Sequence, residues 1–224
     1  MREAVVLVHG IWSNGMDMWR LRRQLSRAGY ECHIFRYQLW GKPPAEIASL
    51  LHEFIDTMDA PVVHFVGHSF GGIVLLHMFN RYPFSRDGRI VLMGAPVTGS
   101  VVGKRHGSVP IPRWTLRKTT EQGILGDVPQ WKGWQDIGII AGTFPLGAGL
   151  VAGGPDMPHD GTVSVDETRL KGATDFIALP VSHTGMLISS RVATQVVTFL
   201  RSGKFGDVVG TPLLDTSVGG FFFL

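Results

Sequence analysis

The sequence is poor in cysteine, in long apolar runs and in charge of one sign. Cys32 is the only cysteine among 224 residues, so no disulfide can form within the chain and no cysteine-based zinc site is available. The absence of disulfides fits a reducing compartment. No apolar run approaches the roughly 20 residues of a transmembrane helix. The formal net charge of +3 is too small to indicate a nucleic-acid partner.

The first residues, MREAVVLVHG, also lack the features of a secretory signal peptide. A charged segment, a longer apolar stretch and a small-residue cleavage site would be needed, and instead the chain enters a strand-like run almost at once. We therefore expect a cytoplasmic protein. Hydrophobic residues make up 44% of the sequence and charged residues 17%, which predicts a globular chain, and this length favours one domain.

Short apolar runs alternate with helical patterns along the chain. The runs expected to form strands are 4–8, 32–37, 62–66, 90–93, 137–141 and 176–179. Helices are expected between a Ser13 or Asn14 cap and Gly29, from Pro43, over 73–79 and over 189–200. This alternation predicts the α/β class, a three-layer α/β/α sandwich with a mostly parallel sheet. The helix that starts at Pro43 has a predicted apolar stripe of Ile47, Leu50, Leu51, Phe54 and Met58.

In such sheets the ligand site lies beyond the carboxyl ends of the strands. The segments that follow the predicted strands are His9-Gly10-Ile11, Ser69, Gly94-Ala95-Pro96, Thr143 and His183. We predict one catalytic domain over 1–202, in which 97–135 is an insertion or a small lid, and an apolar tail over 203–224. The insertion carries a basic cluster, Lys104, Arg105, Arg113, Arg117 and Lys118.

The stretch GHSFG, residues 67–71, matches the pattern G-x-S-x-G and lies between an apolar strand and an apolar helix. In that context the chain turns sharply and holds the serine in a strained conformation, which requires small neighbours two residues to either side. The turn exposes the hydroxyl and directs a helix N-terminus at the charge that develops on a substrate. We predict that Ser69 is a nucleophile.

A serine nucleophile needs a base, and the base needs an orienting acid, in the chain order serine, acid, histidine. His183 follows the last predicted strand and precedes the last helix, so we predict that it is the base. For the acid we choose Asp160, in the polar turn PHDGT, while Asp156 and Asp166 remain alternatives. The oxyanion is expected to be held by the backbone N–H groups of Ile11 and Phe70.

Two further histidines, His9 and His68, are expected to be structural. Residues Trp12 and Met186 adjoin the catalytic loops and are predicted to contact substrate. No metal or cofactor is needed for this chemistry, and no metal or cofactor site is predicted.

On these residues the chain resembles the α/β-hydrolase superfamily, in particular its small bacterial lipases and esterases without a cap domain. VLVHGIW resembles the oxyanion loop of that family, VGHSFGG its nucleophile turn, and HDGTV and HTGML its acid and histidine loops. The resemblance runs from Val5 to Leu200. It implies ester hydrolysis through an acyl-serine intermediate, with Ser69, Asp160 and His183 as the triad and Ile11 and Phe70 as oxyanion donors.

Three hypotheses for the function follow. The first is a serine hydrolase that cleaves short- to medium-chain acyl esters or lipids. The second is a phospholipase or lipid deacylase with transient contact to an anionic membrane through the basic cluster of 97–135. The third is a hydrolase fold without turnover that serves as an interaction module. The apolar end Phe221-Phe222-Phe223-Leu224 predicts docking of the tail on the body or on a second subunit, and thus a homo-oligomer.

Overall fold

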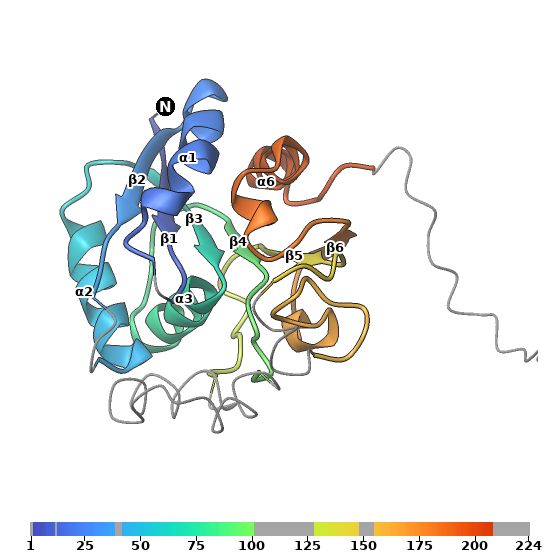
Figure 1. The fold of residues 1–224 in the computed structure, drawn as a ribbon. Coiled ribbons are helices and arrows are strands. Elements are labelled where there is room, and N and C mark those ends of the chain that lie inside the picture. Colours follow the sequence, from blue (N-terminus) through green and yellow to red (C-terminus); the bar gives the residue numbers. More distant parts are fainter. Residues whose placement is uncertain (1, 12, 39–41, 101–127, 148–154, 208–224) are drawn as a thin grey trace, which may run out of the picture.

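One fully parallel sheet of six strands forms the centre of the computed structural model, which describes residues 2–11, 13–38, 42–100, 128–147 and 155–207. The strands lie in the order β2-β1-β3-β4-β5-β6 (Figure 1). Their bounds are β1 Glu3–Val8, β2 Glu31–Phe35, β3 Val62–His68, β4 Ile90–Met93, β5 Ile137–Gly142 and β6 Asp175–Leu179. The order reverses direction between β1 and β3, so the connections after these two strands leave toward opposite faces of the sheet, and a ligand site is expected between them at the carboxyl edge.

Two pairs of helices cover the two faces of the sheet. On one face α2 (Pro44–Asp56) and α3 (Phe70–Arg81) pack together, and on the other α1 (Trp19–Arg27) packs with α6 (Ser190–Ser202) (Figure 1). Short 3-10 turns, η1 (Met16–Met18), η5 (Asp166–Thr168) and η6 (Gly185–Leu187), complete the described elements. The predicted three-layer α/β/α sandwich with a parallel sheet is therefore confirmed.

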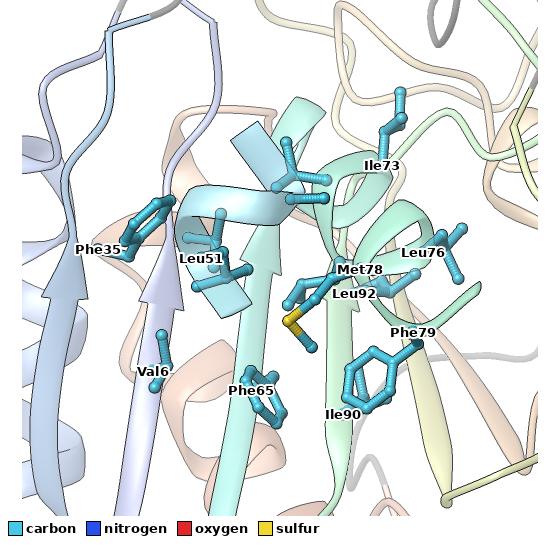
Figure 2. Packing of buried hydrophobic residues seen from close by; sticks show 14 of the residues in the cluster. Val6, Phe35, Leu51, Phe65, Ile73, Leu76, Met78, Phe79, Ile90 and Leu92 are labelled. Atoms are coloured by element: carbon cyan, nitrogen blue, oxygen red, sulfur yellow. The ribbon is translucent and has the colours of Figure 1, made fainter. Parts of the chain in front are cut away.

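The core consists of two hydrophobic clusters, one on each face. Alternation along β1 shows the division, because Ala4, Val6 and Val8 join one cluster while Val5 and Leu7 join the other. Strands that are buried on both faces explain why the sequence shows continuous apolar runs. In the first cluster the ring of Phe65 meets that of Phe79 edge to face, with 5.2 Å between centroids (Figure 2).

Two helices differ in detail from the prediction. Neither predicted cap stands at the start of α1, which begins at Trp19. The Ser13 hydroxyl accepts from the Gly15 N–H at 2.9 Å in the loop, and the Asn14 side chain accepts from the N–H of Met16, the first residue of η1, at 3.0 Å. In α2 the predicted stripe is rotated. Leu50 is 37% exposed. The buried face consists of Pro44, Ile47, Ala48, Leu51 and Ile55, because α2 packs on α3 as well as on the sheet.

The start of the predicted tail is attached to the body. Residues 203–207 follow α6, and the backbone N–H of Phe205 donates to Asp175 at 2.7 Å. The side-chain amide of Gln195 bonds both the N–H and the carbonyl of Gly206, at 2.8 and 3.2 Å. The rest of the tail, 208–224, lies outside the described residues, so its predicted role in an oligomer stays a prediction. None of the helices in the described ranges is long and apolar enough to cross a membrane.

Candidate active site

Ser69 occupies the sharp turn between β3 and α3. Its backbone has φ 53° and ψ −122°, and it is the one residue other than glycine with a positive φ among those the structure describes. A side chain in this conformation costs roughly 1–3 kcal/mol, which the surrounding contacts must offset. The serine stays partly exposed, while Phe70, its neighbour on the helix side, is buried. The turn therefore presents a hydroxyl at the carboxyl edge of the sheet.

Glycine is required beside the serine because backbone segments cross there. A Cβ on Gly71 would lie 2.1 Å from the carbonyl oxygen of Val8 and 2.6 Å from that of His9. The end of β1 thus lies directly against the first turn of α3. Phe70 is the first residue of α3, so its N–H has no partner within the helix and faces the carboxyl edge.

The loop after β1 also touches the serine itself. A Cβ on Gly10 would lie 3.1 Å from the Cβ of Ser69, so a side chain there would fit only if its neighbours shifted by a few tenths of an ångström. His9 holds this loop, because its ring stacks on Tyr37 at 4.1 Å and its carbonyl accepts from the Tyr37 hydroxyl at 2.6 Å. Ile11 follows in the same loop and packs against the first cluster. Trp12 lies outside the described residues.

Asp160 and His183 are joined by a hydrogen bond. The imidazole Nδ1–H donates to Oδ2 of Asp160 at 2.7 Å, and the backbone N–H of His183 donates to the Asp160 carbonyl at 2.8 Å. Oδ1 accepts from the N–H groups of Thr162 and Val163 at 2.8 and 2.7 Å. The carboxylate is fully buried and has both oxygens occupied. The structure therefore brings Asp160 to His183, while Asp156 and Asp166 are exposed.

Gly94, at the end of β4, lies between this pair and the serine. A Cβ there would be 3.1 Å from Oδ2 of Asp160 and 3.2 Å from Nδ1 of His183. The preceding residue, Met93, accepts a hydrogen bond from the Ser69 N–H at 2.9 Å. Sequence reasoning placed Gly94 after a strand but gave it no role. The sequence showed only a glycine at the end of a strand, and the neighbouring Asp160 and His183 explain why no side chain fits there.

His68 connects the turn to the histidine loop. Its Nε2–H donates to the backbone carbonyl of His183 at 2.9 Å, and the two rings lie 4.8 Å apart. The pKa of His68 is lowered to about 4, chiefly by burial and in smaller part by the nearby His183. Within the described residues no hydrogen bond joins the Ser69 hydroxyl to His183, whose Nδ1 bonds Asp160.

Two other predicted features, the substrate contact of Met186 and the basic cluster of 97–135, are not seen at the site. Met186 is completely buried in the second cluster, packed beneath the end of β5, so in this structure it is a core side chain and its contact with substrate stays a prediction. The basic cluster of 97–135 falls within 101–127, outside the described residues. A small cavity of about 140 Å³ lies at the C-terminal end of α3, between Tyr82 and Trp134, at the opposite edge of the sheet from Ser69.

The carboxyl edge therefore holds a strained serine, a buried Asp–His pair and a free helix N-terminus. The sequence profile of the alpha/beta hydrolase family matches residues 5–205. The chain belongs to the alpha/beta hydrolase family. A carboxylesterase of Bacillus subtilis (strain 168) is 29% identical over 106 residues, which are 42% of this chain and 42% of that protein. The match thus spans less than half the length of that relative.

Several solved structures are similar to this chain in fold. The mature lipase BlEst2 of Bacillus licheniformis has a TM-score of 0.68 at 18% identity, covering 88% of this chain and 90% of that one. The phospholipase PlaB of Legionella pneumophila has a TM-score of 0.72 at 13% identity, covering 90% and 60%. The esterase EaEST of Exiguobacterium antarcticum has a TM-score of 0.62 at 16% identity, covering 90% and 92%. At these identities the likeness concerns the fold alone.

Proposed function

We propose that this alpha/beta hydrolase is a serine hydrolase of carboxylic esters that works through an acyl-enzyme. The observation that carries the proposal is the strained backbone of Ser69 at the carboxyl edge of the sheet. The residue before it, His68, bonds the backbone of His183, and the His183 ring bonds the buried Asp160. The strained conformation costs stability in an ordinary turn, but it exposes the hydroxyl in the way that a nucleophile requires.

In the acylation step the Ser69 oxygen attacks the ester carbonyl carbon and its proton passes to Nε2 of His183. Asp160 accepts from Nδ1–H, which fixes the tautomer with a free Nε2 and stabilises the imidazolium. The backbone N–H groups of Phe70 and Ile11 would hold the oxyanion. When the tetrahedral intermediate collapses, the carbon–oxygen bond to the alcohol breaks and the alcohol takes the proton from Nε2.

Deacylation repeats these steps with water. Nε2 of His183 accepts a proton from water while the oxygen of that water attacks the acyl carbonyl, and the second intermediate is held by the same two N–H groups. The bond to Ser69 then breaks, its oxygen recovers the proton from the imidazolium, and the carboxylic acid leaves.

The test is hydrolysis of p-nitrophenyl esters of increasing chain length by the wild type and by Ser69→Ala. Removal of the hydroxyl should lower kcat by on the order of 10³- to 10⁶-fold. Ser190→Ala, which removes an exposed serine hydroxyl at the start of α6, is the control and should keep full activity. A wild type that hydrolyses no ester and takes no fluorophosphonate label would contradict the proposal and favour a non-catalytic interaction module.

A second candidate, a lipid hydrolase acting at an anionic membrane, is favoured by the exposed face of α1. Arg20, Arg23 and Arg27 share that face, and among the described residues none has a carboxylate partner. Like charges at these spacings destabilise a helix, and an anionic surface would relieve the repulsion. Trp19 and Met16, 55% and 62% exposed, lie at the end of this face near the loop after β1. Tryptophan suits the membrane–water interface.

Vesicle co-sedimentation tests this candidate. Vesicles that contain phosphatidylglycerol should retain the wild type at low salt, and pure phosphatidylcholine vesicles should not. Replacement of Arg20, Arg23 and Arg27 by Gln should abolish retention, while the same three-charge loss at the exposed Arg169, Lys171 and Arg191 should not. Equal retention of both triple variants would exclude α1 as the contact. Turnover of a soluble ester should be unchanged in both.

A further inference from the structure

His68 is hydrogen-bonded to one member of the predicted triad and covalently joined to another. It is the last residue of β3 and precedes Ser69 directly, while its ring reaches the backbone of His183. The two partners are 115 positions apart in the chain. Every shift of the ring relative to the histidine loop therefore changes the separation between the serine and the imidazole.

In the hydrogen bond between the His68 ring and the His183 carbonyl, the proton must lie on the ring. The carbonyl of His183 can only accept, so Nε2 of His68 must carry the hydrogen, and the neutral ring leaves a lone pair on Nδ1. Nδ1 faces the loop after β1, because a Cβ on Gly10 would lie 3.4 Å from it. The buried ring thus lies between the oxyanion loop and the histidine loop.

The other polar groups of His183 are also occupied. Its backbone N–H and its Nδ1 both bond Asp160, and its carbonyl bonds His68, which leaves Nε2 as the polar atom without a partner among the described residues. The two bonds to Asp160 hold the imidazole relative to the acid loop. Among the hydrogen bonds of the described residues, the bond from His68 is the one that holds the imidazole relative to the strand that carries the serine.

We infer that His68 is a positioning residue, which sets the distance from Ser69 to the His183 imidazole by donating its Nε2–H to the His183 backbone carbonyl. The inference rests on the proposed serine hydrolase function. Because the imidazole must be in place when the Ser69 proton moves, loss of this bond acts on the chemical step and leaves ester binding unchanged. A displacement of about 1 Å in such a group can lower the rate by about 10²-fold.

Three variants separate positioning from general packing. His68→Leu keeps a buried side chain of similar volume and has no donor, whereas His68→Gln places an amide N–H near the position of Nε2. His64→Leu is the matched control, since His64 is a buried histidine of the same strand that bonds Glu3 and the Arg89 N–H instead.

We expect kcat for a p-nitrophenyl ester to fall about 10- to 100-fold in His68→Leu with KM within about twofold. His68→Gln should recover most of kcat, and His64→Leu should lower the melting temperature while kcat is kept.

A readout without turnover keeps this inference distinct from the proposed function. The low-field proton resonance of the bond between His183 Nδ1 and Asp160 should shift or broaden in His68→Leu and remain in His68→Gln. A wild type without esterase activity would overturn the proposed function, and the resonance would still test the position of His183. An unchanged resonance and kcat in His68→Leu, or a His68→Gln as impaired as His68→Leu, would overturn the role of the donated bond.

Discussion

The two halves of the candidate site are held in place by different forces. The serine turn consists of regular elements, β3 and α3, whose backbones approach the end of β1 so closely that Gly71 has no room for a side chain. The acid and histidine loops contain no strand or long helix around Asp160 and His183. There the chain is fixed by side-chain hydrogen bonds, three of them to the Asp160 carboxylate.

This difference predicts different consequences of mutation. Close packing of backbones tolerates no added atom, because neither partner can move away without unpairing the sheet. A hydrogen-bonded loop can lose or reverse one bond while the fold persists. Atoms added to the glycines of the turn should therefore cost stability, whereas the loss or reversal of a hydrogen bond in the loops should cost catalysis.

Apart from removal of the Ser69 hydroxyl, the largest expected effect is that of Asp160→Asn on catalysis. The N–H groups of Thr162 and Val163 require an oxygen at the Oδ1 position, so the new amide must turn its NH₂ toward His183. Nδ1 then has to accept, which moves the imidazole proton to Nε2 and removes the base. Such a tautomer change costs about 10⁴-fold in kcat in serine proteases, and we expect a similar loss in ester hydrolysis.

Asp166→Asn provides the control for this variant. Asp166 is exposed and bonds Arg169 at 3.0 Å on the surface, so kcat should stay within about twofold of the wild type. A large loss in Asp166→Asn, or a full rate in Asp160→Asn, would show that the acid had been assigned to the wrong aspartate.

The next effect in size is that of Gly71→Ala on stability. Its Cβ would meet the Val8 carbonyl oxygen at 2.1 Å, a backbone atom that cannot rotate away. The free energy of unfolding, measured in urea, should fall by about 3 kcal/mol or more. Gly206→Ala is the control, because the nearest atoms to its Cβ lie 3.6 Å away. Equal melting of the two variants would refute close packing as the reason for Gly71.

The same contrast explains what could be predicted from the sequence. The serine turn is contiguous, so GHSFG between an apolar strand and an apolar helix indicated its structure without knowledge of any distant residue. The rotated stripe of α2 and the space beside Gly94 depend on partners that helical periodicity does not reveal. His68 was predicted to be structural from its neighbours in sequence, but its bond to the His183 carbonyl spans 115 positions and has no local signal.

The smallest expected effect concerns His68, where the two halves meet. Because burial lowers its pKa from 6.5 to about 4, the unfolded chain binds a proton between these values that the folded chain excludes. Stability should therefore fall as the pH drops below 6.5, and the His68 contribution reaches about 2 kcal/mol at pH 5. Protonation would place a positive charge beside His183, and the attraction of Asp160 and Asp17 only partly offsets the loss of hydration. The lowered pKa values of the buried His9 and His64 act in the same direction.

Urea unfolding of the wild type and His68→Gln at pH 7 and pH 5 isolates the contribution of His68, since Gln does not titrate. The wild type should lose about 2 kcal/mol more than the variant between the two values. Parallel losses would mean that the ring is already hydrated and that the two halves of the site are joined less tightly than the 2.9 Å bond indicates.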